Sequence, residues 1–242
     1  MKLKKIASLM LAGVMAVSML AGCATTSVEP EQPEKPETPA TSAAADALYS
    51  ELTGSAKEKV TAVANADLDS ALDNAVAKYW NYGSMTAGDV FKDEIDRVNY
   101  AGVVDYRETR IGAAVKDAVK ANWLSIASAH NGGTDGSQFS CPTDATNRKA
   151  VEIYAVPASV SDAMALEIVA EKIDPYVSKL PVQGGFDQED DKYNNEMDGK
   201  ANYDFSYTIS ASIETKTVNI AGLEQGIKYV AVMMTKTVAE KG

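Results

Sequence analysis

An alternation of side-chain types near the C-terminus constrains the fold more than any other feature of this sequence. From Tyr203 to Ile213 every second residue is apolar or aromatic, and the residues between them are polar or small. Successive side chains of a β-strand point to opposite faces of a sheet. A period of two over eleven residues therefore predicts a strand with one face in the core.

The segment from Ile227 to Val238 is the expected partner of this strand. One of its faces is predicted to carry Tyr229, Ala231, Met233, Thr235 and Thr237, and the other Val230, Val232 and Met234. A short connection from Ala221-Gly222 to Gly226 separates the two segments, so we expect antiparallel neighbours. Residues 217–220 either extend the first strand or begin the turn. A shorter strand is expected from Val151 to Val156, before Pro157.

The first half of the globular part is predicted to be helical. Apolar residues recur at steps of three and four, which is typical of helices with one buried face. The expected helices run from Leu68 to Trp80, from Thr86 to about Tyr100, and from Ile111 to about Ala129. We expect Trp123 on the buried stripe of the third. The fold class predicted from these patterns is α+β, with a helical first half packed on a largely antiparallel sheet from the second half.

One further helix is expected between the predicted strands. Ser161 or Asp162 can cap its N-terminus, and its apolar residues continue to Ile173. Pro175 is expected to stop it, because proline lacks the backbone N–H that a helix interior requires.

The N-terminus has the layout of an export signal. Three lysines precede the apolar run Ile6–Leu20, whose fifteen residues are short of the roughly 20 that a membrane-spanning helix needs. The run ends in Leu20-Ala21-Gly22-Cys23, which resembles the lipobox of bacterial lipoproteins. The resemblance implies cleavage before Cys23 and a diacylglycerol thioether on that cysteine. The expected location is the extracytoplasmic face of the cell membrane, because two acyl chains anchor a protein stably.

Composition divides the chain into three parts. Residues 1–22 are the expected signal peptide, and residues 23–45 comprise the lipidated cysteine and a segment with a proline at every third position from Pro30 to Pro39. Such a segment has too few apolar groups to offset its ordering entropy, so it predicts an extended tether. Residues 46–242 are expected to form one α+β domain.

Charge and cysteine content exclude several classes of function. The formal charge is −11, and it becomes −14 without the three lysines of the signal. A chain this acidic repels phosphate backbones, so no nucleic-acid partner is expected. Cys23 and Cys141 are its two cysteines, so lipidation of the first leaves no pair for a disulfide. Cys141 is expected to be a partly buried apolar residue, with a reactive thiol as the alternative.

The sequence contains no familiar catalytic set. His130 is the single histidine, and no Gly-x-Ser-x-Gly or Ser-x-x-Lys spacing is present. A classical hydrolase and a structural zinc site are therefore not expected, and we predict neither a metal nor a cofactor. The six carboxylates between Asp187 and Asp198 could bind a hard cation, but Lys192 replaces the turn glycine of an EF-hand loop. A solvated acidic loop is the expected structure.

One stretch resembles the CAP domain, also called SCP-like, of exported bacterial proteins. The matching residues are Arg97, Ala101-Gly102, Glu108, Trp123, Ser125 and His130. The resemblance implies an extracellular domain with Glu108 and His130 in one cleft. The sequence departs from the family where Arg107 and Thr109 flank the glutamate, and where the first histidine of the family's pair is missing near Gly83–Ala87. Its paired-histidine cleft is therefore incomplete.

These features favour a surface lipoprotein with a non-catalytic binding domain. Its expected partners are the membrane, through lipid on Cys23, and a wall component, peptide or protein ligand. A divergent CAP-like domain with Glu108 and His130 as binding residues is one alternative. A structural component of the cell envelope is the other. A cleft that unites Glu108 and His130 would favour the former, and a broad apolar patch the latter.

Overall fold

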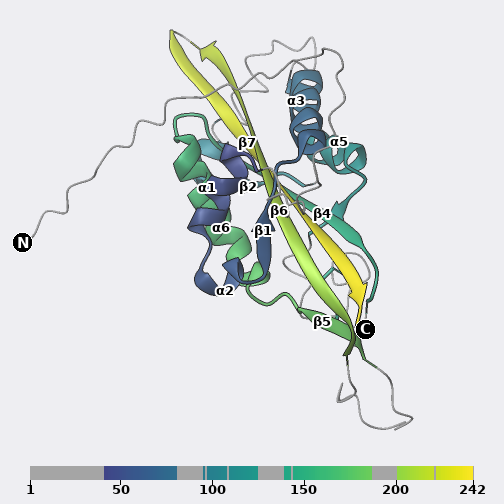
Figure 1. Ribbon diagram of the computed structural model, residues 1–242. Helices are drawn as coiled ribbons and strands as arrows, with labels where there is room; N and C mark the ends of the chain where they lie inside the picture. The colour runs from purple at the N-terminus through teal and green to yellow at the C-terminus, as the bar shows by residue number, and fades with distance from the viewer. Residues whose placement is uncertain are drawn as a thin grey trace, which may run out of the picture. The chain divides into compact units, whose positions relative to one another are not determined.

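The computed structural model describes residues 41–80, 95, 97–107, 109–124, 139–142, 144–186, 201–220 and 222–241. In chain order the elements are α1 (Ala43–Glu51), α2 (Gly54–Lys57), β1 (Val60–Ala62), α3 (Ala66–Trp80), β2 (Val104–Asp105), α5 (Arg110–Ala118), β3 (Asn122–Trp123), β4 (Arg148–Pro157), α6 (Asp162–Val177), β5 (Gln183–Phe186), β6 (Ala201–Ile220) and β7 (Leu223–Glu240). Figure 1 shows these elements along the chain. None of the helices described is long and apolar enough to cross a membrane.

The strands form one seven-stranded, mostly antiparallel sheet. Its main order is β1-β6-β7-β4-β2, while β3 pairs with β4 and β5 with β6. Only the β1–β6 and β3–β4 pairs are parallel. Helices dominate the first half of the chain and the long strands the second half, which confirms the predicted α+β class.

The hairpin of β6 and β7 is the central unit of the sheet. The two strands pair from Tyr203 with Glu240 to Ile220 with Leu223, as antiparallel neighbours. The prediction for this pair is confirmed, and residues 217–220 prove to extend the first strand. Strand β6 ends at Ile220 and β7 begins at Leu223, and between them Gly222 has a φ of 85° and its N–H donates to the Asn219 side chain. Glycine adopts this left-handed conformation without a steric cost.

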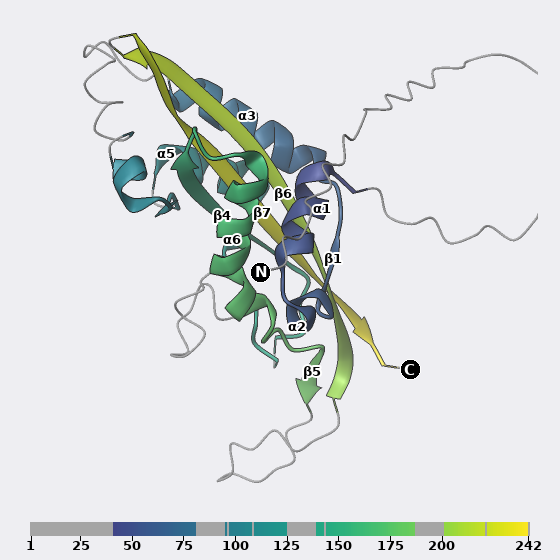
Figure 2. The ribbon, with the colours of Figure 1, turned by 90° about the vertical axis from the view of Figure 1, so that its left-hand side faces the viewer.

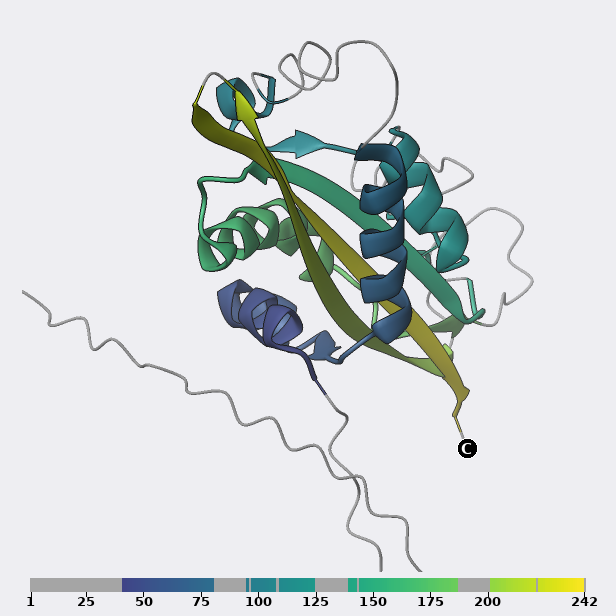
Figure 3. The ribbon, with the colours of Figure 1, turned by 90° about the horizontal axis from the view of Figure 1, so that it is seen from above.

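Helices cover both faces of the sheet (Figures 2 and 3). On one face α1 and α6 pack against a core that includes Tyr207, Ile209 and Val232. On the other face α3 and α5 pack against Ile153, Tyr229 and Met233. Because β7 lies in the middle of the sheet, both of its faces are buried from Ile227 to Met234. The two predicted faces of this strand are therefore confirmed, each with its own core.

The N-terminal turns of three helices are capped as their sequences suggest. The Ser42 hydroxyl caps α1, the Asn65 side chain accepts from the Leu68 N–H at the start of α3, and Ser161 caps α6. Each cap satisfies a backbone N–H that has no partner within its helix. The first helix begins at Ala43 and Ala45 is fully buried, so the folded domain includes residues that precede Asp46.

The predicted helix from Ile111 to Ala129 is wrong between Ala118 and Leu124, and its last residues, 125–129, lie outside the described part of the chain. Helix α5 ends at Ala118, and Lys120 takes a left-handed conformation with a φ of 53°. The Ala121 N–H then donates to the Lys116 carbonyl and the Lys120 N–H to that of Asp117, which is a Schellman motif. Trp123 consequently lies on the short strand β3, half-buried, instead of on a helical stripe. Glycine usually occupies the left-handed position after a helix. Because Lys120 occupies it here, the sequence carried no signal that α5 ends at Ala118.

The expected stop at Pro175 is also wrong, because α6 continues through it to Val177. A proline this close to the C-terminus removes one hydrogen bond, to the Glu171 carbonyl. Tyr176 and Val177 are buried in the core, and their packing holds the last turn in place. The expected helix from Thr86 to Tyr100 falls mostly outside the described residues, where only Ile95 and residues 97–101 are seen to be helical.

Candidate functional site

Several features singled out from the sequence lie outside the described part of the chain. They are Cys23, Glu108, His130 and the acidic segment from Asp187 to Asp198. Cys141 is described and is partly exposed, near the start of a loop that leads into β4.

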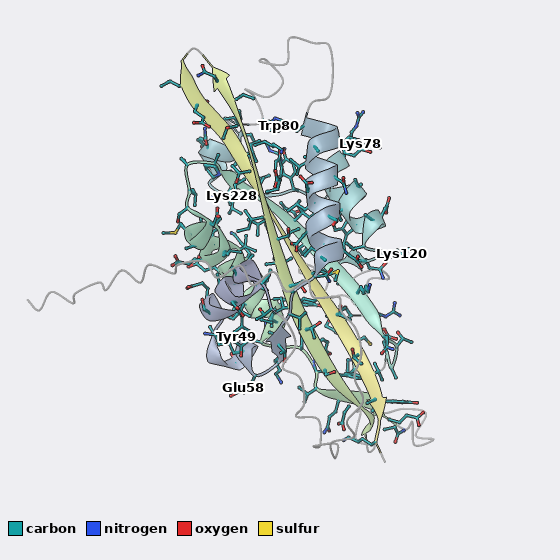
Figure 4. All side chains as sticks on the ribbon, turned by 45° about the horizontal axis from the view of Figure 1, so that its top comes forward. Tyr49, Glu58, Lys78, Trp80, Lys120 and Lys228 are labelled. Atoms are coloured by element: carbon teal, nitrogen blue, oxygen red, sulfur yellow. The ribbon has the colours of Figure 1, made fainter. Side chains whose placement is uncertain are left out.

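Three aromatic residues, Tyr79, Trp80 and Tyr82, lie close together in the sequence at and after the end of α3. Trp80, labelled in Figure 4, is 6% exposed, and its ring centroid lies 6.4 Å from that of Tyr229 in an edge-to-face contact. It is a core residue. Tyr79 is partly exposed, and Tyr82 lies outside the described residues.

A buried carboxylate is the first candidate site. Glu152 on β4 is 1% exposed, and its Oε2 lies 3.4 Å from the Arg107 Nε. Arg107 also donates to Asp105, with 2.6 Å between Nε and Oδ2. The more exposed Asp105 therefore competes with Glu152 for the same guanidinium.

Burial raises the pKa of Glu152 to about 8, although Arg107 opposes the increase. The Glu152 Oε1 is buried and has no hydrogen-bond partner among the described residues, and the same is true of the Tyr176 hydroxyl on α6. Burial also raises the pKa of Tyr176 to about 12. The nearby Ser140 side chain opposes this rise, but it does not form a hydrogen bond with the Tyr176 hydroxyl. The Glu152 carboxyl can therefore hold a proton near neutral pH, and it lines neither of the two hollows described below.

Two buried lysines on β7 hold neighbouring loops. Lys228 donates to the Val160 carbonyl and pairs with Asp162, each at 2.5 Å. Lys236 is fully buried, donates to the Asp144 carbonyl at 2.6 Å, and lies 3.9 Å from the centroid of the Phe205 ring. Burial lowers the pKa of Lys236. Both ammonium groups are thus occupied by internal contacts, which assigns them a role in stability.

A groove at the edge of the sheet is the second candidate site. It has a volume of about 510 Å³ and lies where the N-terminal turns of α1 and α6 approach residues Ala211–Glu214 of β6. Asp69 and Asp73 of α3 line its other side. Alanines form much of the wall, at positions 43, 44, 47 and 163. Because these side chains are short, they leave the space between the helices and the strand unfilled.

Carboxylates determine the charge of this groove. Four line it: Asp69, Asp73, Asp162 and Glu214. Asp162 pairs with Lys228, and Glu214 with Lys216 at 2.8 Å. Asp69 and Asp73 are exposed, and in the described part of the chain neither side chain forms a hydrogen bond or ion pair. The groove therefore carries two carboxylates beyond those neutralised by its lysines.

A smaller hollow of about 410 Å³ lies beside the hairpin. Its lining includes Asn99, Ser159, Thr217 and Glu224. The Thr217 hydroxyl donates to the Glu224 carboxylate across the two strands, so its most prominent polar groups contact each other. Among the described residues, no cluster of histidine, cysteine and carboxylate side chains is arranged to hold a metal ion.

Neither the buried carboxylate nor the groove was predicted from the sequence. Glu152 interrupts the apolar run from Ala150 to Pro157, and a charged residue in such a run is a signal that could have been read from the sequence. The groove has no local signal, because its lining comes from four elements that are distant in the chain. Comparison of this chain with protein-family models, with curated proteins and with solved structures finds no match.

Proposed function

We propose that this chain is an exported, lipid-anchored protein whose folded domain binds a ligand in the groove beside β6 and does no chemistry on it. The lipobox-like tetrapeptide ending at Cys23 supports the anchor. The groove supports the binding role. It joins an apolar wall to two carboxylates that form no hydrogen bond or ion pair within the described residues, a combination that is typical of ligand sites.

The single observation that carries the binding role is the pair of unpartnered carboxylates, Asp69 and Asp73. Several other charged groups of the domain already have partners in the fold, including Lys228, Lys236 and Arg107. Groups used in this way stabilise the domain and are not free to bind a ligand. Among the described residues Asp69 and Asp73 form no hydrogen bond or ion pair, although Asp73 lies near enough to Lys216 to help raise the pKa of that lysine. They lie on one face of α3 because residues four apart are helical neighbours.

Site-specific photo-crosslinking in cells tests the binding role. A photoreactive amino acid at Ala163, which is exposed and lines the groove, should give an adduct with the ligand. Ala113 is the matched control, because it is exposed on α5, which packs against the opposite face of the sheet. Adducts of equal yield at both positions, or none at Ala163, would contradict a ligand site in the groove.

Replacement of Cys23 by Ser tests the anchor separately. The variant should lose palmitate labelling, and it should leave the membrane fraction or remain unprocessed. Unchanged processing and detergent partitioning would contradict lipidation at this cysteine.

The CAP resemblance supports a second candidate function, a divergent CAP-like domain with Glu108 and His130 in one cleft. A nearby carboxylate would raise the histidine pKa above its ordinary value of about 6.5. An NMR titration of His130 should then show a lower pKa in a Glu108→Gln variant. An unchanged pKa would contradict the shared cleft. The third candidate, a structural envelope component, would be favoured if neither the groove nor this cleft binds a ligand.

A further inference from the structure

An open stretch of sheet edge begins in the groove, at Ile213, and continues along β6 beyond it. The Ile209 carbonyl accepts from the Val63 N–H, and the Phe205 N–H donates to the Val182 carbonyl, so odd-numbered residues of β6 direct their backbone groups away from β7. Backbone groups alternate in direction along an antiparallel strand. Ile213, Thr215, Thr217 and Asn219 therefore point theirs toward the same edge. No backbone hydrogen bond joins these four residues to a neighbouring strand in the described part of the chain.

The edge is open because its neighbour is short. Strand β1 pairs with β6 only from Tyr207 to Ile209, and the chain then leaves the sheet to begin α3 at Ala66. An extended segment placed after β1 would meet unpaired N–H and carbonyl groups two residues apart. Such an edge is a template for pairing with another chain.

The walls of the groove would receive the side chains of an added strand on both of its faces. Ala47 and Leu166 belong to the wall on the side of α1 and α6, which suits apolar side chains. Asp69 and Asp73 belong to the wall on the side of α3, which suits cationic ones. Side chains of a strand alternate between two faces, so one segment can satisfy both walls.

We propose that the groove binds an extended, cationic peptide segment of a partner protein, which adds to the β6 edge as a further strand. Its alternate basic side chains face Asp69 and Asp73, and the side chains between them contact the alanine-rich wall. This inference rests on the proposed function, because it names the class of ligand for the same groove. A second copy of this chain is a weaker occupant, because a formal charge of −11 on each copy opposes pairing at an acidic edge.

Synthetic peptides provide the first test, with the full chain purified in detergent. An eight-residue peptide alternating lysine and valine should bind at least tenfold more tightly than its glutamate–valine counterpart, and its affinity should fall with salt. Equal binding of both peptides, or of neither, would overturn the inference. If a crosslink at Ala163 still forms while no peptide binds, the proposed function stands and only the strand addition fails.

Backbone methylation of the peptide tests strand pairing without altering the protein. N-methyl groups on one set of alternate residues should abolish binding, because those N–H groups pair with β6. The same groups on the other set should be tolerated, since those N–H groups point away. Equal tolerance of both methylated peptides would overturn strand addition, whatever the effect of charge.

Two protein variants complete the test. Asp69→Asn with Asp73→Asn should weaken binding about threefold to tenfold, as expected for two exposed ion pairs. The control, Asp67→Asn with Asp117→Asn, removes the same charge from exposed positions outside the groove and should change binding less than twofold. Equal effects of the two double variants would overturn the site. A concentration-dependent dimer that the peptide cannot dissociate, seen by analytical ultracentrifugation, would overturn it in favour of a second copy.

Discussion

At the residue scale, Glu152 makes the stability of the domain depend on pH. Its pKa is about 8 in the folded protein because burial disfavours the carboxylate, whereas the unfolded chain has the ordinary value near 4.3. Between these two pH values the folded state retains a proton that the unfolded state has released. The free energy of unfolding therefore falls as the pH rises through this window, and it levels off above it.

Glu152→Gln should remove this part of the pH dependence. We expect the variant to exceed the original protein in stability at about pH 9, by up to a few kcal/mol at roughly 1.4 kcal/mol per unit of pKa difference. Urea unfolding at about pH 5 and about pH 9 measures the effect. Glu167→Gln, at an exposed position of α6, is the control. Parallel pH profiles for all three proteins would show that Glu152 is not held protonated by burial.

At the scale of elements, the end of α5 offers a stabilising substitution. Lys120 holds the left-handed position of a Schellman motif, where a side chain costs about 1 kcal/mol that glycine avoids. Lys120→Gly should raise the free energy of unfolding by roughly 0.5–1 kcal/mol. Lys120→Ala keeps the steric cost and serves as the control. Equal stabilities for the glycine and alanine variants in thermal unfolding would argue against this helix end.

The core face of β6 supplies the second prediction at this scale. Ile209 is fully buried between the sheet and the helices α1 and α6. Ile209→Asp would place an unpaired charge there and should destabilise the domain by about 4 kcal/mol or more. Ser206→Asp, at an exposed position on the opposite face of the same strand, should have little effect. Chemical denaturation compares them, and similar midpoints would place Ile209 in solvent.

At the scale of the whole molecule, the boundary between tether and domain can be located by limited proteolysis. The composition of residues 24–40 predicts a protease-sensitive tether, whereas the Ser42 cap and the buried Ala45 tie the next residues to the fold. Trimming should therefore stop near residue 41, which mass spectrometry of the resistant fragment determines. Early cuts within residues 43–80 would show that α1 and α3 are not stable parts of the domain.

The sequence by itself determined the elements whose signals are local. The alternation from Tyr203 to Ile213 and the helical spacing from Leu68 to Trp80 are both found where expected, because side-chain direction follows directly from backbone geometry. The N-terminal cap of α6 at Ser161 could also be predicted, because a cap interacts only with the first turn of its helix. The anchor at Cys23 remains a prediction from sequence alone.

Only the tertiary structure decided the features that depend on distant contacts. Strand β1 has three residues, too few for a periodic signal, and it exists because β6 pairs with it. Gly112 lies inside α5, where a Cβ would come within 2.2 Å of the Tyr106 carbonyl oxygen, so the packing of α5 on the preceding segment requires glycine at this position. The groove likewise needs four elements brought together. Such features follow from packing between segments far apart in the chain, which local propensity does not encode.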